Sequence, residues 1–354
     1  MESKNILANV SIIRPILIVL LVFYHAFAIY GGAWTPLEGY PEVEAYWWLD
    51  KFSYAFMLES FVFVSGYVFG YQVRTKGVGK LDAKSLFWSK FKRLIIPSMI
   101  FSLLYILILG NIRQSVVQTL YGIINGEGHM WFLPMLFWCF VAVWTIEKLK
   151  LGPRLVIPLL LVLAICSIVP LPLRLSNAQY YALFFYVGYI LQRNNVGFEQ
   201  YYSSRNTIFL IVLFIISFVS LTIFKKNIGG IIQSGGRYLF HNQFIAKAIQ
   251  LLIAKVATIV YSSIGLAMLF VAVGTADKSR KTQLPQWITN VGGLCMGVYL
   301  FQQFILKLAY YHTGLPYIVG PYLLPWVAFI IALLMSLLLS YLLHTTRFGR
   351  ELIG

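Results

Sequence analysis

Charged side chains are scarce in this chain. Asp, Glu, Lys and Arg make up 11% of its 354 residues, whereas a soluble domain carries about 25%. The chain is instead 59% hydrophobic and 17% aromatic. So little charge and so much apolar sequence exclude an ordinary soluble protein and indicate a protein that crosses a membrane several times.

Cysteine is scarce as well, which excludes a disulfide framework and a cysteine-ligated metal site. Cys139, Cys166 and Cys295 lie in apolar segments at unrelated spacings, so we expect them to be packing residues. The zinc-binding HExxH pattern, the Walker A phosphate loop and the GxSxG nucleophile pattern are also missing. The sequence therefore predicts no metal cofactor.

The sequence has no acidic excess, and its formal net charge is +16. The basic residues are scattered between apolar runs, so membrane topology explains them better than nucleic-acid binding does. The first apolar run lacks a small-residue cleavage site and is long enough to span, so we expect no cleaved signal peptide. We expect residues 1–354 to form a single integral-membrane domain with no appended soluble domain.

Apolar runs of spanning length recur along the whole chain, and the fold class they predict is an all-α bundle of about ten transmembrane helices. The fifth and sixth runs are the shortest. The ten runs lie near residues 7–29, 50–72, 91–110, 129–147, 155–172, 178–193, 206–224, 245–274, 287–312 and 322–345.

Basic residues gather in alternate connections, and this asymmetry predicts the orientation. The first connection, TPLEGYPEVEAYWWLD, has four acidic residues and no basic one. The second has seven basic residues, counted into the start of the third helix, and the third has only Arg113. Both termini are therefore predicted to be cytoplasmic. The basic seventh connection, 225–247, lies on the predicted outside, and we expect a long loop there, which obeys the rule less strictly.

The first apolar run contains RPILIVLLVFYH, with Arg14 at one end and His25 at the other. Eleven helical residues bring the two side chains onto one face, about 16 Å apart along the axis. Ionisable side chains at bilayer depth persist mostly where they face a partner, a cavity or a substrate. One face of this helix thus presents a cation and a candidate base.

The second predicted helix carries a single acid, Glu59, at a depth compatible with His25. A carboxylate beside an imidazole raises its basicity, which would make His25 a general base. The alternative is a purely structural hydrogen bond that braces two helices. Ser65 and Gly66 predict a close helix–helix contact through small residues.

Polar residues in the later helices offer further candidates. Lys90 and Arg93 lie one helical turn apart at the predicted cytoplasmic edge, where they would either clamp a phosphate or extend into the interface as ordinary flanking cations. The predicted outer half holds residues that would bind substrate, or would instead form an interfacial aromatic belt and interhelical hydrogen bonds: His129, Trp131, Tyr299, Gln302 and Gln303.

Taken together, these motifs resemble the acyltransferase-3 family of bacterial membrane O-acyltransferases. The resemblance rests on Arg14-x10-His25, ESFVFVSGY, Lys90-x-x-Arg93, HMWFLPML and VYLFQQ, in that order along the chain. It implies that His25 is the essential histidine, Arg14 its paired arginine, and Glu59 the acid before the Ser65–Gly66 turn. The chain departs from the family pattern at Lys90, where the family has Arg, at Phe61–Val62, where it has two Phe, and at Gln302–Gln303, where it often has His.

The resemblance implies transfer of an acyl group, acetyl above all, from acetyl-CoA in the cytoplasm to a hydroxyl of a cell-surface glycan. We expect His25 and Glu59 to be catalytic, Arg14, Lys90 and Arg93 to bind the donor, and Ser65 to belong to the substrate-binding set. The partners would be acyl-CoA, a carbohydrate or glycolipid acceptor and membrane lipids, in the bacterial inner membrane. A glycan or small-molecule exporter is the competing class, and a membrane acyltransferase for a lipid or peptide acceptor is a third.

Overall fold

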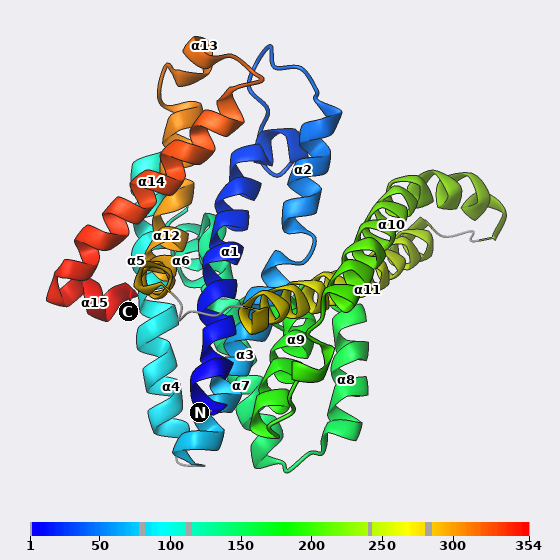
Figure 1. Cartoon of the computed structure of the whole chain (residues 1–354). Helices are drawn as coiled ribbons and strands as arrows, with labels where there is room; N and C mark the ends of the chain where they lie inside the picture. The colour runs from blue at the N-terminus through cyan, green and yellow to red at the C-terminus, as the bar shows by residue number, and fades with distance from the viewer. Residues whose placement is uncertain (1, 78–81, 111–114, 240–242, 280–284, 354) are drawn as a thin grey trace. The chain divides into compact units, whose positions relative to one another are not determined.

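The computed structural model describes residues 2–77, 82–110, 115–239, 243–279 and 285–353, and all regular elements in these ranges are helices (Figure 1). The positions Lys80, Arg113, Arg280 and Lys281, which contribute to the predicted orientation, lie outside the described residues. The chain forms two compact units, which are described separately. The first comprises Met1–Met57, Ala83–Phe137 and Lys281–Gly354, and the second comprises Leu58–Asp82 and Trp138–Arg280.

The first unit is built around α1, which packs against α2, α12 and α14. α1 is one uninterrupted helix despite Pro15, so the predicted 16 Å rise from Arg14 to His25 stands. Its helices are α1 (Glu2–Gly31), α2 (Glu44–Tyr54), α4 (Ala83–Lys90), the π-helix η2 (Phe91–Ile95), α5 (Ile96–Leu109), α6 (Val116–Asn125), the 3₁₀-helix η3 (Gly128–Trp131), the start of α7 (Phe132–Lys148), α12 (Gln286–Tyr311), α13 (Leu315–Val319), α14 (Leu324–Thr345) and α15 (Arg347–Ile353).

The second unit contains the helical pairs α8·α9 and α10·α11, with α8 also contacting α11. α9 is buried along most of its length, and its buried residues include many tyrosines and phenylalanines. The helices are α3 (Met57–Lys76), most of α7, α8 (Pro153–Ile165), α9 (Leu175–Arg193), the 3₁₀-helix η4 (Glu199–Tyr201), α10 (Ser204–Leu239) and α11 (Gln243–Ser279).

Glycines bring α3 and α9 into direct backbone contact. A Cβ atom on Gly66 would lie 2.0 Å from the carbonyl oxygen of Phe185, and one on Gly70 would lie 2.3 Å from that of Tyr189. Gly188 of α9 makes the reciprocal approach to the Phe63 carbonyl of α3, at 2.3 Å. The close contact predicted at Ser65–Gly66 is therefore confirmed, and the spacing Gly66-x-x-x-Gly70 extends it by one helical turn.

Two predicted helices have different boundaries in the structure. The run predicted at 50–72 is broken between α2 and α3 at residues 55–56. The apolar pattern continues across this turn, so hydropathy does not reveal the break. The run predicted to start at residue 91 already begins at Ala83. Many residues of α4 are polar, and a helix does not need apolar residues to continue. The apolar run therefore starts later than the helix.

The prediction of a long seventh loop is wrong. Residues 225–239 continue α10 and residues 243–247 begin α11, so that the two helices, 36 and 37 residues long, are joined by a short connection (Figure 1). The lysines at 225 and 226 end the apolar run but not the helix, because lysine has good helix propensity. A 36-residue helix is about 54 Å long, much longer than the roughly 30 Å hydrocarbon core of a bilayer.

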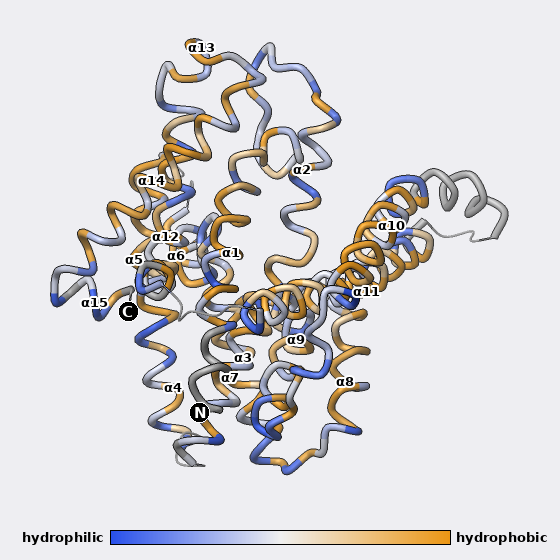
Figure 2. The backbone as a smooth tube through the Cα atoms, in the orientation of Figure 1, coloured by the Kyte–Doolittle hydropathy of each residue, from blue (hydrophilic) through white to orange (hydrophobic). Residues whose placement is uncertain are grey.

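Within the described ranges, eight helical stretches are long and apolar enough to cross a membrane, and apolar residues run along them in Figure 2. The runs predicted at 155–172 and 178–193 correspond to α8, which has 13 residues, and to α9, which is rich in tyrosine. The chain is thus an all-helical, multi-pass membrane protein. The total of ten spans and the cytoplasmic termini stay predictions.

The orientation can be tested by cysteine labelling in a Cys166→Ser background, because Cys166 is exposed whereas Cys139 and Cys295 are buried. Glu38 and Lys84 both have exposed side chains. We expect Glu38→Cys to react with a membrane-impermeant maleimide in intact cells and Lys84→Cys to react only after permeabilisation. The reverse pattern would invert the topology and the assignment of the donor side.

Candidate functional site

His25 is buried in the first unit, with 7% of its surface exposed. Its ring stacks on Trp34, with 5.8 Å between ring centroids and an interplanar angle of 14°. The hydroxyl of Tyr310 on α12 donates to the backbone carbonyl of Ala26, which fixes α12 against α1 next to the histidine. The imidazole is therefore held in one place by packing.

Polar atoms of His25 and Gln302 lack hydrogen bonds of normal geometry within the described part of the chain. Gln302 of α12 lies within hydrogen-bonding reach of the His25 ring. Among the described residues, however, neither His25 Nδ1 nor the amide nitrogen or oxygen of Gln302 has a hydrogen bond of normal geometry. Each buried polar group left unpaired costs about 1–3 kcal/mol. Unpaired atoms on two neighbouring buried side chains indicate a place where a bound molecule completes the hydrogen bonds.

His129, by contrast, has its Nδ1 and both of its backbone polar groups hydrogen-bonded. Its backbone N–H donates to Gln303 Oε1 at 3.1 Å, and its Nδ1 lies 2.7 Å from the same oxygen. Since the backbone N–H requires that oxygen to be the acceptor, Nδ1 carries the proton. The Tyr299 hydroxyl donates to the His129 carbonyl, and the His129 ring centroid lies 6.1 Å from that of His25. Three of the predicted substrate-binding residues thus form a brace that joins η3 to α12 beside His25.

Besides Gln302, two more of the predicted substrate-binding residues lie outside this brace. Trp131 ends η3, is half-buried and packs against the Phe132 ring with 6.2 Å between centroids. Ser65 belongs to the second unit, where its hydroxyl donates to the Phe61 carbonyl one turn earlier on the same helix, at 2.8 Å. This bond satisfies the serine within its own helix.

Sequence reasoning missed Lys307, which lies in the same unit close to His25. Its ammonium is 4.5 Å from the centroid of the Trp34 ring and 4.9 Å from that of Tyr311. The only sequence signal was a single lysine within an apolar run. This signal does not mark a site by itself, because lysines near helix ends usually reach the interface.

At the other end of the same face of α1, Arg14 has Arg93 and Cys295 as electrostatic neighbours. The structure thus brings together two of the three predicted donor-binding cations, from α1 and η2. Guanidinium groups repel each other, and a bound polyanion removes that repulsion. This arrangement suits phosphate.

Lys90 and Arg93 are not arranged as predicted, because Phe91–Ile95 is a π-helix. A π-helical turn takes more residues than an α-helical turn, so side chains three apart no longer share one face as in an α-helix. Lys90 ends α4 and is half-buried, whereas Arg93 is exposed. π-Helical turns within α-helices occur frequently at functional sites.

Glu59 lies in the second unit, 4% exposed, in the first turn of α3. The Tyr180 hydroxyl donates to Glu59 Oε1 at 2.8 Å, and Ser262 and Lys255 are further partners of the carboxylate. The break between α2 and α3 frees the N-terminal amides of α3, where negative charge is favourable. The predicted orientation of His25 by Glu59 stays a prediction, because the two residues belong to different units.

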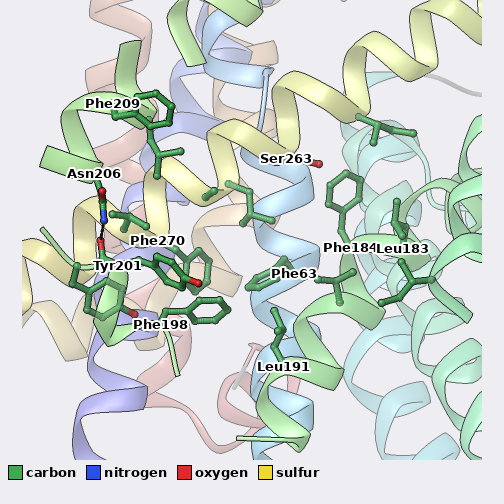
Figure 3. Close-up of a pocket in the computed structure, with 18 of the residues that line it drawn as sticks. Phe63, Leu183, Phe184, Leu191, Phe198, Tyr201, Asn206, Phe209, Ser263 and Phe270 are labelled. Carbon is green, nitrogen blue, oxygen red and sulfur yellow. Dashed lines mark hydrogen bonds between the residues drawn. The ribbon is translucent and has the colours of Figure 1, made fainter. Parts of the chain in front are cut away.

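The second unit also contains an apolar cavity of about 700 Å³ (Figure 3). Its wall is mostly aromatic and aliphatic and includes Phe63, Phe184 and Phe270, while Asn206 at its edge donates to the Tyr201 carbonyl at 2.9 Å. No histidine, acid or cation belongs to the lining. The cavity therefore offers no imidazole or carboxylate base, and the candidate chemistry lies at His25.

The structure defines a multi-pass helical membrane protein with a buried histidine. The Nδ1 atom of this histidine has no hydrogen bond of normal geometry among the described residues. Residues 7–345 match the model of the acyltransferase-3 family, described as an acyltransferase domain. The chain therefore belongs to that family, as the sequence motifs predict, and is a membrane acyltransferase. Comparisons with curated proteins and with solved structures gave no match.

Proposed function

We propose that this protein transfers an acetyl group from acetyl-CoA, bound at the cytoplasmic side of the bacterial inner membrane, to a hydroxyl of a cell-surface carbohydrate or its precursor. The observation that carries the proposal is the pair of buried side chains with unpaired polar atoms, His25 and Gln302, in a chain of this family. One is a base and the other offers an amide donor. Ester formation from a thioester needs both functions.

The reaction follows from these two groups. His25 accepts the proton of the acceptor hydroxyl while its oxygen attacks the thioester carbonyl carbon. The amide N–H of Gln302 donates to the carbonyl oxygen as negative charge develops on it. The carbon–sulfur bond then breaks, the acetyl ester forms, and the imidazolium returns the proton to the departing thiolate of coenzyme A.

The cations at the other end of α1 fit the donor. Arg14 and Arg93 are neighbours, and the rise along α1 puts Arg14 about 16 Å from His25. The phosphates of coenzyme A carry its charge, and its long neutral arm ends in the thioester. Phosphates at the arginine pair would let this arm extend along α1 to the histidine.

The proposal is tested with purified protein in lipid nanodiscs, by following the release of free coenzyme A thiol from acetyl-CoA. We expect turnover by the native protein that rises when carbohydrate acceptors are added. Saturable carbohydrate transport in proteoliposomes without thiol release would contradict the proposal and favour an exporter. Glycan mass spectrometry of cells with and without the gene would identify the acetylated acceptor.

Arg93→Ala is expected to raise the KM for acetyl-CoA about tenfold or more, with a smaller change in kcat. A phosphate contact remote from the reacting atoms contributes equally to the ground state and the transition state. The control is Lys92→Ala, the neighbouring exposed cation, whose ammonium lies 5.3 Å from the Trp88 ring centroid. Equal donor KM values for the two variants would mean that Arg93 does not bind the donor.

A further inference from the structure

Lys307 is a cation in an unusual place. It lies on α12 four residues after Gln303 and four before Tyr311, within a stretch that is apolar enough to span a membrane. It is half-buried, and its ammonium rests on the rings of Trp34 and Tyr311. Charged side chains within membrane-spanning stretches are costly, and they usually mark a substrate or ion pathway.

Two other partly buried lysines of this chain are compensated by a carboxylate. Lys51 forms an ion pair with Asp50 at 3.0 Å, and Lys255 has Glu59 as an electrostatic neighbour. Across the described part of the chain, Lys307 has no ion pair with a carboxylate. Its electrostatic neighbour is instead His25.

The proximity of His25 is a second reason to expect an anion near Lys307. When His25 takes a proton during acyl transfer, two positive charges lie close together in a poorly solvated place. Aromatic rings attract a cation by about 0.5–2 kcal/mol, which does not neutralise its charge. An anionic group bound at Lys307 would compensate both cations.

The donor does not supply that anion. Its phosphates belong at the arginine pair in the proposed function, about 16 Å away along α1, and the part that reaches His25 is neutral. The acceptor is the remaining reactant. We propose that Lys307 binds a carboxylate or phosphate of the acceptor, so that the protein acylates an acidic carbohydrate; this inference rests on the proposed function.

Binding of simple sugars to the protein in nanodiscs tests the inference without requiring turnover. The probes are methyl β-D-glucuronide, methyl β-D-glucoside 6-phosphate and the neutral methyl β-D-glucoside, titrated by saturation-transfer difference NMR. We expect at least one acidic probe to bind the native protein about tenfold or more tightly than the neutral one, since one charge-assisted contact is worth about that factor. Which acidic probe prevails separates carboxylate from phosphate.

Lys307→Met should abolish this preference, because methionine keeps the chain length and the packing on Trp34 but removes the charge. Lys307→Arg should keep it. Lys92→Met is the matched control, since Lys92 also lies over a tryptophan ring but near Arg93 rather than His25. It should leave the preference unchanged.

Either of two binding results would overturn the inference: the native protein binds no acidic probe better than the neutral one, or Lys307→Met retains the preference. A Lys307→Met variant that slows transfer to acidic and neutral acceptors equally would likewise assign Lys307 to the reaction itself. Release of coenzyme A thiol, measured in the same preparations, tests the proposed function separately. Turnover without acidic preference refutes only the present inference, and acidic preference without turnover refutes only the acyl transfer.

Discussion

His25→Ala is expected to lower kcat for acetyl transfer by about 10²–10⁴-fold, the usual contribution of a positioned general base. The imidazole is buried against Trp34, and its Nδ1 lacks a hydrogen bond among the described residues. A histidine kept only for structure would satisfy its Nδ1, as His129 does by donating to Gln303. Removing His25 should therefore abolish proton transfer while the brace between η3 and α12 remains.

The measurement is the acetyl-CoA turnover rate, compared with the elution profile and thermal midpoint of the purified protein. His25→Gln retains a polar side chain without a base and should be as inactive as His25→Ala while packing better. His312→Ala removes an exposed histidine from the end of α12 and should keep full activity. Near-native turnover in His25→Gln would exclude His25 as the base.

Glu59→Gln is expected to reduce kcat less than His25→Ala. If the carboxylate acts by orientation, the amide oxygen can still accept the hydrogen bond that Tyr180 now donates to Glu59. Turnover of both variants, measured in one preparation series, decides the point. Losses of equal size would make Glu59 a direct participant in the chemistry.

Gly66→Ala is expected to destabilise the protein strongly, by about 1–3 kcal/mol or more, because an added methyl has no room. The new Cβ would lie 2.0 Å from the Phe185 carbonyl oxygen, and a backbone atom cannot move aside as a flexible side chain can. α3 and α9 would have to separate. The lost contacts would run along both helices, since Gly70 and Gly188 make similar approaches.

The thermal midpoint of unfolding in detergent checks this expectation. Gly293→Ala is the matched control, because that glycine is also helical and has open space where its Cβ would be. It should leave the midpoint unchanged or raise it, since alanine favours the helix. Equal midpoints for the two variants would show that α3 and α9 do not pack as closely as described.

Much of this molecule could be predicted where a single helix carries the information. Helical periodicity places Arg14 and His25 on one face, and small-residue spacing predicts the contact at Gly66. Contacts between distant helices leave no such pattern. Gln303 and His129 are 174 positions apart, and no spacing rule joins them. The same holds for Lys307 and Trp34, where the sequence offers one lysine and one tryptophan among many aromatic residues.

Breaks within a helix were equally hidden. Hydropathy is unchanged across residues 55–56, although the helix is interrupted there. The π-helix at Phe91–Ile95 is likewise not visible in the sequence FKRLI. Both features change the direction of a side chain without changing the composition. A prediction from helical periodicity alone assumes an unbroken α-helix, and it therefore places Lys90 and Arg93 on one face.

The π-helix also makes this part of the chain tolerant of a change in length. Removing one residue from Phe91–Ile95 would allow the wide turn to rewind as α-helix with little loss of backbone hydrogen bonds. The wide turn already holds one residue more than an α-helical turn, so α4 and α5 would keep nearly the same rotation relative to each other. A single-codon deletion here would thus preserve both the fold and the side of the helix on which Lys90 lies. Relatives with one residue fewer at this point would keep their cation at the same place.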